Sequence, residues 1–383
     1  MKSYSLSTPT LVTNIFSLLC TVFGALTPMT AVGLAFIGFS PSAQALICTT
    51  ADDKMCKSAV DPQFGGGFSP TVGYGGFGGA TGCTATRTPV IFIHGNTDWA
   101  YSLAANTYQV PGYSKPPNSV YQELKNAGYK DCEIYGVNYL NSSERGSAAM
   151  NYHQESKFDI INGFIKQVKS FTGKSQVDII SHSFGVSMSI ATLHYYNNWG
   201  SVRRFINIAG GLHGLDSCIY TGYSNAYAPT CGSQNVYDGW VFGFFPDSWS
   251  PGINPWTADN GAWYSLPAAP AQAPNTSFYT LYAGTKDQIM CSTYSDYSVC
   301  GNSPKFRSYT NVKAQINVGA GSDTQQVNWD YTTGWPYNVS GGDTSGVGHF
   351  HAKNNTGKII VNMLTTTCTG TGCASGYTYG PAQ

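Results

Sequence analysis

A serine flanked by small residues follows a short apolar run near the middle of the chain. Residues 177–180 read VDII, residues 181–185 read SHSFG, and a helical pattern follows over 187–196. Small-x-Ser-x-Gly between a buried strand and a helix is the nucleophile-elbow arrangement, in which a tight turn exposes the serine above a sheet. Ser181 stands where glycine is more usual, but serine is also small. We therefore predict that Ser183 is a nucleophile for acyl transfer.

A nucleophilic serine needs a histidine base, which should come last in the chain order serine, acid, histidine. His349 lies in the late loop GVGHF (346–350), whose glycines suit a segment that must reach the site. His351, two residues on, is the alternative. His194 lies in the helix after the elbow, and His213 comes too early in the order. We predict His349 as the base.

The acid that orients this histidine should lie at the carboxyl end of a strand, where ligand-handling residues of open α/β sheets gather. Asp287 follows the strand pattern over 277–283 through a short turn, and we predict it as the acid. Three rivals lie in loops rich in tyrosine and glycine, with no strand directly before them: Asp296, Asp330 and Asp343.

The negative charge of an acyl-transfer intermediate is held by main-chain N–H groups of the oxyanion hole. One should belong to Phe184, the residue after the nucleophile, and the other to the loop after an early strand. His94-Gly95-Asn96 occupies that loop, so Asn96 is the second candidate. We expect His94 to hold the loop by hydrogen bonding.

The surrounding pattern predicts a parallel sheet covered by helices. The run VIFI at 90–93 is apolar throughout, as expected of a strand buried on both faces. Strand and helix patterns then alternate, which is typical of βαβ units. Further strands are expected over 132–139, 177–180, 204–208, 277–283 and 312–318, and helices over 119–127, 157–171, 187–196 and 358–365.

Two stretches lack such patterns. Residues 65–82 are rich in glycine and contain a match to G-x-G-x-x-G at 73–78, which we reject as a dinucleotide site because no apolar strand precedes it and no helix pattern follows. We expect a loop there. Residues 212–275 are aromatic-rich without clear period and predict a long irregular insertion of loops and short elements. No linker or repeat is visible, so residues 46–383 should form a single α/β domain.

Composition excludes several classes of protein. The 383 residues include 20 Lys+Arg and 20 Asp+Glu, and 42% are hydrophobic. This balance is neither that of a disordered chain nor that of a nucleic-acid-binding protein. No C-x2-C occurs and the histidines do not cluster beside cysteines, so we expect no metal and no cofactor.

The amino-terminal segment predicts export. Residues 3–51 carry no charge, an apolar stretch spans about 15–39, and Ser42-Ala43-Gln44-Ala45 resembles a cleavage site. We expect residues 1–45 to be a secretory leader cut after Ala45, leaving a secreted chain with no stable membrane insertion; a membrane anchor is the alternative. Cleavage removes Cys20 of the 11 cysteines, and the even remainder suits an oxidising compartment. Proximity in sequence suggests the pairs 48/56, 218/231, 291/300 and 368/373, which leaves 83/132.

With these residues the sequence resembles the α/β-hydrolase lipases broadly. More closely, it resembles the extracellular bacterial poly(3-hydroxybutyrate) depolymerases that attack native, amorphous polymer and lack a separate binding domain. The similarity extends over nearly the whole mature chain. The segments that carry it are TPVIFIHGN (88–96), GKSQVD (173–178), HSFGVSMS (182–189), APTCGSQN (228–235), VKAQINVGAGS (312–322) and GVGHF (346–350).

The resemblance implies the α/β-hydrolase fold, the triad Ser183, Asp287 and His349, and an oxyanion hole at Asn96 and Phe184. Position 184 is Phe where the family pattern has Met, which keeps the main-chain N–H. Exposed aromatic residues would suit an uncharged polyester surface because they bury area while staying soluble. The candidates for polymer contact are Tyr152, Tyr220, Tyr223, Tyr237 and Trp249.

We therefore expect a secreted, monomeric serine esterase that hydrolyses short-chain polyhydroxyalkanoates, with a hydrophobic polyester surface as its partner. One alternative is a lipase or small-ester carboxylesterase with the same triad. Another is a non-catalytic polymer-binding protein, but a decayed site should lack a triad member, and none is missing here.

Overall fold

The apolar run at residues 90–93 forms strand β3 (Val90–Ile93) in the interior of a large sheet. The computed structural model describes residues 63–215, 218, 229–231, 236–237, 240–244, 253–259, 262–291, 301–321, 329–330, 335–336, 343 and 346–383. The predicted leader over 1–45 lies outside these residues.

The central sheet has eight strands in the order β1-β2-β4-β3-β5-β6-β11-β12. β2 runs antiparallel to β4, and the remaining neighbours are parallel. A mostly parallel sheet flanked by helices confirms the predicted α/β-hydrolase fold. The bounds of the other seven strands are Gln63–Phe64 (β1), Gly76–Gly78 (β2), Ile134–Val137 (β4), Val177–His182 (β5), Val202–Ile208 (β6), Ser277–Tyr282 (β11) and Val312–Asn317 (β12).

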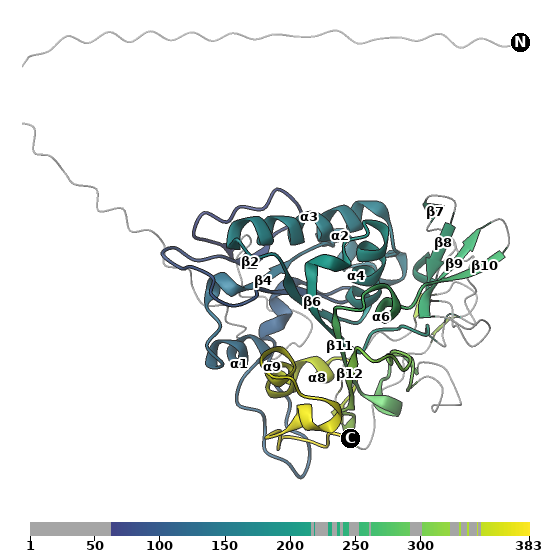
Figure 1. Cartoon of the computed structure of the whole chain (residues 1–383). Helices are drawn as coiled ribbons and strands as arrows, with labels where there is room; N and C mark the ends of the chain where they lie inside the picture. The colour runs from purple at the N-terminus through teal and green to yellow at the C-terminus, as the bar shows by residue number, and fades with distance from the viewer. Residues whose placement is uncertain are drawn as a thin grey trace, which may run out of the picture. The chain divides into compact units, whose positions relative to one another are not determined.

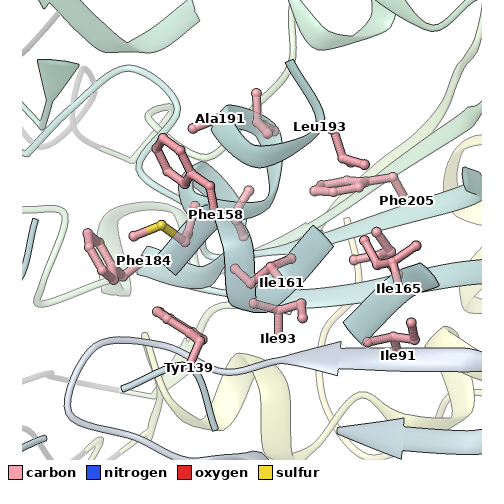
Figure 2. Close-up of a cluster of buried hydrophobic side chains, with 14 of the residues drawn as sticks. Ile91, Ile93, Tyr139, Phe158, Ile161, Ile165, Phe184, Ala191, Leu193 and Phe205 are labelled. Atoms are coloured by element: carbon pink, nitrogen blue, oxygen red, sulfur yellow. The ribbon is translucent and has the colours of Figure 1, made fainter. Parts of the chain in front are cut away.

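Two apolar clusters cover the two faces of this sheet, because side chains alternate along each strand. Ile91 and Ile93 of β3 face α3 (Glu155–Thr172) and α4 (Phe184–Tyr195), as Figure 2 shows. Val90 and Phe92 belong to the opposite cluster, with α1 (Val120–Asn126) and α9 (Gly357–Thr365). α3 and α4 accordingly lie on one side of the sheet, and α1 and α9 on the other (Figure 1). The sheet is therefore buried on both faces, as the run VIFI predicts.

The helix ends follow local sequence signals. Ser119 caps α1 by accepting a hydrogen bond from the N–H of Gln122, and Gly173 ends α3 in the left-handed region at φ 67°. The shorter described helices are Ser142–Arg145 (α2), Ala269–Gln272 (α6) and His351–Asn354 (α8). The 3-10 turns are Ala100–Ala104 (η1), Asp131–Glu133 (η2), Ala148–Met150 (η3), Trp199–Ser201 (η4), Pro229–Cys231 (η5), Gly284–Lys286 (η7) and Gly370–Ala374 (η8).

The glycine-rich stretch is not only a loop, which corrects the expectation for 65–82. Gly76–Gly78 forms β2, which pairs with β1 on one side and β4 on the other. A Cβ at Gly76 would lie 2.1 Å from the carbonyl oxygen of Gly136, so the close approach of the two strands requires glycine there. Alternation of apolar side chains cannot reveal such a strand, because glycine has no side chain.

The stretch over 212–275 is also more regular than expected. Its described part contains an antiparallel sheet in the order β10-β9-β8-β7. The register between β9 and β10 shifts between Ser265 and Leu266, so residues 254 and 255 of β9 form a bulge. A bulge tolerates a proline inside a strand, and Pro255 lies there. That interruption hid the strand from the sequence pattern. The bounds are Val236–Tyr237 (β7), Trp240–Gly243 (β8), Ile253–Asp259 (β9) and Ala262–Leu266 (β10).

Two short ribbons complete the described strands. β13 (Ala320–Gly321) pairs with β16 (Gly346–Val347), and β14 (Trp329–Asp330) pairs with β15 (Trp335–Pro336). Within the described ranges, no helix is both long enough and apolar enough to cross a membrane.

The cysteine pairs expected from the sequence are confirmed where they are described. The disulfides are Cys83–Cys132, Cys218–Cys231 and Cys368–Cys373. Cys291 is also disulfide-bonded. Its expected partner Cys300 and the expected pair 48/56 lie outside the described residues.

Candidate active site

Ser183 occupies the turn between β5 and α4. Its backbone has φ 54° and ψ −127°, a conformation that residues with a side chain rarely adopt. The turn brings Gly185 so close to β3 that a Cβ there would lie 2.3 Å from the carbonyl oxygen of His94. Only glycine fits that position, as the elbow pattern requires.

Ser181, the less usual residue at the start of the elbow, is accommodated by a second serine. Its hydroxyl lies 2.9 Å from the hydroxyl of Ser189, which itself donates to the carbonyl of Gly185 at 2.7 Å. Ser181 therefore donates to Ser189, and its buried hydroxyl is satisfied. The substitution leaves the turn intact.

The structure brings the three predicted triad residues into one chain of hydrogen bonds. Nε2 of His349 lies 2.8 Å from Oγ of Ser183, and Nδ1 lies 2.9 and 3.0 Å from the two carboxylate oxygens of Asp287. Asp287 and His349 are buried, and 9% of Ser183 is exposed. Nδ1–H donates to Asp287, which leaves the lone pair of Nε2 to accept the Ser183 hydroxyl. This tautomer is the one that a general base needs.

Asp287 is fixed by its own main chain. It follows β11 through η7, and its Oδ1 accepts the N–H groups of Ile289 at 3.1 Å and Met290 at 3.0 Å. These donors hold the carboxylate in place with both of its oxygens within hydrogen-bond distance of Nδ1 of His349. The other described candidates lie elsewhere: His194 bonds Gln272, His213 bonds the carbonyl of Lys305, and Asp330 lies in β14. Asp296 lies outside the described residues.

Asp343, a rival for the acid, instead supports the loop that carries His349. Its carboxylate accepts the N–H groups of Gly348 at 2.9 Å and His351 at 2.5 Å. It also accepts the side-chain amide of Gln288 at 2.5 Å, and Gln288 in turn accepts the main-chain N–H of His349 at 3.0 Å. Burial raises the pKa of Asp343. The sequence did not point to Gln288, because its partners are distant in the chain.

His351, the alternative base, is directed away from Ser183. Its Nδ1 lies 2.8 Å from the carbonyl oxygen of Gly346, and its ring stacks on Tyr108 with centroids 4.5 Å apart. A carbonyl oxygen can only accept, so Nδ1 of His351 carries the proton. His351 therefore belongs to the support of the loop.

The two predicted oxyanion residues flank the serine. Phe184 is the first residue of α4, so its N–H lies at the helix N-terminus, which favours negative charge. A Cβ on Gly95 would lie 3.0 Å from Cβ of Ser183, which places the main chain just before Asn96 beside the nucleophile. The Asn96 side chain is engaged elsewhere, with Ala148 at 2.8 Å and Asn151 at 2.6 Å. The main-chain N–H is then the group of Asn96 suited to an oxyanion.

His94 holds the loop over residues 94–96 by hydrogen bonding, as expected. Its Nδ1–H donates to the carbonyl of Gly95 at 2.8 Å, its Nε2 accepts the N–H of Tyr139 at 3.3 Å, and the two rings stack with centroids 4.3 Å apart. Burial lowers the pKa of His94 to about 3. The imidazole therefore stays neutral near pH 7 and serves as a structural hydrogen-bonding group.

A buried lysine joins the segment that follows β3 to the helix that follows His349. Nζ of Lys353, in α8, lies 3.5 Å from Oδ2 of Asp98 and 3.1 Å from the carbonyl oxygen of Ser102. Burial raises the pKa of Asp98. The contacts of Lys353 with Asp98 and Ser102 link α8 to the segment that follows β3. Removing one partner would leave the other charge buried without a counter-charge.

The structure describes two of the five aromatic residues that are predicted to contact polymer. Tyr152 is half-buried, with Nζ of Lys157 5.5 Å from its ring centroid. Tyr237 lies in β7. Tyr220, Tyr223 and Trp249 lie outside the described residues. Their contact with polymer stays a prediction.

Sequence reasoning missed His153, which packs behind Phe184. Its Nε2 lies 2.7 Å from Oγ of Ser187, and its ring centroid lies 4.8 Å from that of Phe184 and 5.3 Å from that of Phe244. Burial holds the pKa of His153 well below its usual value. These contacts fix the first turn of α4. In the described residues, no three acidic, histidine or cysteine side chains gather as a metal site would require.

Comparison with known proteins gives a partial match. Residues 87–238 match the family described as Lipase (class 2), which is less than half of the chain. No curated protein matches. A solved Bacillus licheniformis lipase in its mature form is 16% identical, with TM-score 0.32 over 55% of this chain and 71% of that one. The propeptide form is 15% identical, with TM-score 0.35 over 69% of this chain and 50% of that one. A Bacillus subtilis carboxylesterase is 14% identical, with TM-score 0.29 over 58% and 73%.

The strand order of the central sheet and the elbow at Ser183 are those of the α/β-hydrolase fold, and residues 87–238 are similar to the class 2 lipases.

Proposed function

We propose that the chain is a secreted serine esterase that hydrolyses the ester bonds of poly(3-hydroxybutyrate) and related short-chain polyesters. The observation that carries the esterase proposal is the chain of hydrogen bonds from Asp287 through His349 to Ser183, with Nε2 of His349 2.8 Å from Oγ of Ser183. An imidazole in that position can remove the serine proton as the oxygen attacks a carbonyl carbon.

Acylation follows from this geometry. Oγ of Ser183 attacks the ester carbonyl while Nε2 of His349 takes the hydroxyl proton, and Asp287 stabilises the imidazolium that forms. The N–H groups of Phe184 and Asn96 hold the oxyanion of the tetrahedral intermediate. Collapse of this intermediate breaks the ester C–O bond, and the imidazolium returns its proton to the leaving alcohol oxygen.

Deacylation repeats these steps with water. His349 removes a proton from the water molecule, whose oxygen attacks the acyl carbon bound to Ser183. The second intermediate collapses, the serine recovers its proton, and a hydroxy acid or shortened chain leaves. Neither half-reaction needs a metal or an organic cofactor.

The polyester substrate rests on the resemblance of six segments to the amorphous-polymer depolymerases and on the aromatic composition. An uncharged polyester offers no charge to pair with, and only 10% of the residues are charged while 14% are aromatic. Secretion rests on the amino-terminal segment and is supported by the disulfides, which persist in oxidising compartments. We further propose that the mature chain acts as a monomer.

The decisive experiment is the release of 3-hydroxybutyrate from amorphous granules by the purified chain and by Ser183→Ala. We expect the variant to lose activity by about 1,000-fold or more, since the nucleophile is gone. Ser201→Ala is the matched control, because it removes another buried serine hydroxyl at η4, before β6, away from the elbow. Hydrolysis that persists in Ser183→Ala would show that the nucleophile is wrong, and granule binding without product would favour a non-catalytic binding protein.

A lipase or small-ester carboxylesterase is the second candidate, favoured by the match of residues 87–238 to the class 2 lipases. Triglycerides and p-nitrophenyl esters assayed beside amorphous granules separate the two. Turnover of the small esters and triglycerides without release of 3-hydroxybutyrate would select the lipase and exclude the depolymerase.

A further inference from the structure

The peptide groups on both sides of His349 are held by side chains adjacent in sequence to the other two triad residues. His182 precedes Ser183, and its Nε2 lies 3.0 Å from the carbonyl oxygen of His349. Gln288 follows Asp287, and its Oε1 accepts the N–H of His349 at 3.0 Å. The nucleophile and the acid are thus each linked to the main chain of the base by a neighbouring residue.

The His182 contact has a fixed direction. A carbonyl oxygen only accepts, so Nε2 of His182 carries the proton and donates to His349. The ring is 1% exposed, and burial holds the pKa of His182 well below its usual value. His182 also lies beside the loop over residues 94–96, since a Cβ on Gly95 would lie 3.0 Å from its Nδ1. The imidazole therefore packs between the loop of the base and the turn that carries Asn96.

The Gln288 contact is fixed by Asp343. The amide nitrogen of Gln288 donates to Asp343 at 2.5 Å, so its oxygen must face the N–H of His349. The loop allows no larger residue at Gly348, where a Cβ would lie 2.7 Å from the carbonyl oxygen of Lys286 and 2.4 Å from Oε1 of Gln288. The side chains of Gln288 and Asp343 are buried and polar, and each has defined hydrogen-bond partners.

Loop residues are ordinarily mobile, but a general base must remain within hydrogen-bond reach of its proton. His349 precedes the short helix α8 and follows the two-residue strand β16, neither of which is long enough to fix a side chain alone. Its position relative to Ser183 therefore depends on side-chain contacts with its main chain.

We propose that His182 and Gln288 are positioning residues that clamp the main chain of His349 and thereby set the 2.8 Å approach of its Nε2 to Ser183. This inference rests on the proposed esterase chemistry. His182 precedes the nucleophile and Gln288 follows the acid. Both hold the main chain of His349, and we assign neither a contact with the reacting atoms.

The test compares His182→Met with His182→Gln. The glutamine amide can supply an N–H donor near the place of Nε2, whereas methionine fills similar volume without a donor. Displacement of the base by a fraction of an ångström should lower kcat for a soluble p-nitrophenyl ester by about 10- to 100-fold in His182→Met, with KM nearly unchanged. His182→Gln should recover most of kcat. Gln288→Met should resemble His182→Met, and the double variant should lose less than the product of the two effects.

Matched controls separate positioning from stability. His194→Met removes another histidine hydrogen bond, with Gln272, near the far end of α4. Gln315→Met removes a glutamine whose amide holds both main-chain groups of Phe306, at 2.7 and 3.0 Å. The controls should lower Tm as much as the test variants while leaving kcat unchanged.

A second readout uses no ester substrate. A fluorophosphonate reacts with the activated serine, so its rate of labelling reports the approach of His349 to Ser183, and its endpoint counts correctly folded sites. We expect slow labelling to full stoichiometry in both methionine variants and fast labelling in His182→Gln. Equal labelling rates in His182→Met and wild type, or equal losses in His182→Met and His182→Gln, would overturn the inference. A wild type that is labelled rapidly but hydrolyses no ester would instead refute the proposed function, and the labelling comparison would still decide the inference.

Discussion

Replacement of Asp287 by asparagine is the sharpest test of the proposed triad. In the native site Oδ1 of Asp287 accepts the N–H groups of Ile289 and Met290, and Oδ1 and Oδ2 lie 2.9 and 3.0 Å from Nδ1 of His349. In Asp287→Asn, the two main-chain donors keep the amide oxygen at the Oδ1 position. The amide nitrogen must then face Nδ1.

The amide N–H at the Oδ2 position opposes a proton on Nδ1 and can donate to an unprotonated Nδ1, so the substitution favours the imidazole tautomer protonated on Nε2. That proton points at Oγ of Ser183, 2.8 Å away, and the group that should accept the serine proton becomes a donor. The overall fold is unchanged because asparagine matches aspartate in size. The loss in kcat should be about 10,000-fold, which corresponds to about 5.5 kcal/mol of lost transition-state stabilisation.

The assay is steady-state hydrolysis of a soluble ester, with thermal unfolding measured on the same preparations. Asp343→Asn is the comparison variant, because Asp343 is also buried and lies in the same network but contacts only the support of the loop. It should lose far less activity than Asp287→Asn. A kcat of Asp287→Asn within about tenfold of wild type, or a larger loss in Asp343→Asn, would refute the assignment of the acid.

Three further outcomes follow from the fold. Gly185→Ala should lower the free energy of unfolding by about 1–3 kcal/mol or more, because its Cβ would overlap main-chain oxygens of β3 and the residue after it; an unchanged midpoint in chemical denaturation would contradict this. For Glu133, burial alone would raise the pKa, but hydrogen bonds from the main chain of Lys130, Arg87 and Thr86 lower it below 4.5. The carboxylate of Glu133 should therefore stabilise the fold fully above about pH 4.5, and this stabilisation should be lost as the pH falls through the lowered pKa. The Tm values of wild type and Glu133→Gln should converge in acid, and a difference in Tm that stays constant with pH would contradict the prediction. Opening Cys83–Cys132, which spans 49 residues, should cost about 4 kcal/mol against about 2 kcal/mol for Cys368–Cys373, which spans 5; equal costs for the two serine double variants would refute the loop-entropy account.

The parts of the fold that the sequence predicts are those where side chains carry the pattern. VIFI at 90–93 is apolar on both faces, and α3 has an apolar stripe ended by Gly173, so both follow from the sequence. β2 was missed because its glycines have no side chains to alternate, and β9 because Pro255 interrupts it at a bulge. Main-chain contacts that depend on distant strands leave no local signal.

The candidate site divides in the same way. Ser183 is visible because the elbow is a local motif, and Asp287 and His349 follow from chain order and strand ends. Gln288 was not visible and Asp343 was visible only as a rival acid, since the bonds that give them their supporting role join residues 55 and 61 positions apart in the sequence. Chemistry-bearing side chains are thus easier to predict than the residues that hold them in place.

The backbone strain at Ser183 has a consequence for selection. A residue with a side chain at φ 54° costs of order 1–3 kcal/mol, and glycine would adopt that conformation freely. Ser183→Gly should therefore unfold at a higher temperature than the active protein. A directed-evolution screen that selects for thermal stability alone would enrich the inactive variant Ser183→Gly. A search for a more thermostable variant must therefore also assay hydrolysis in each round.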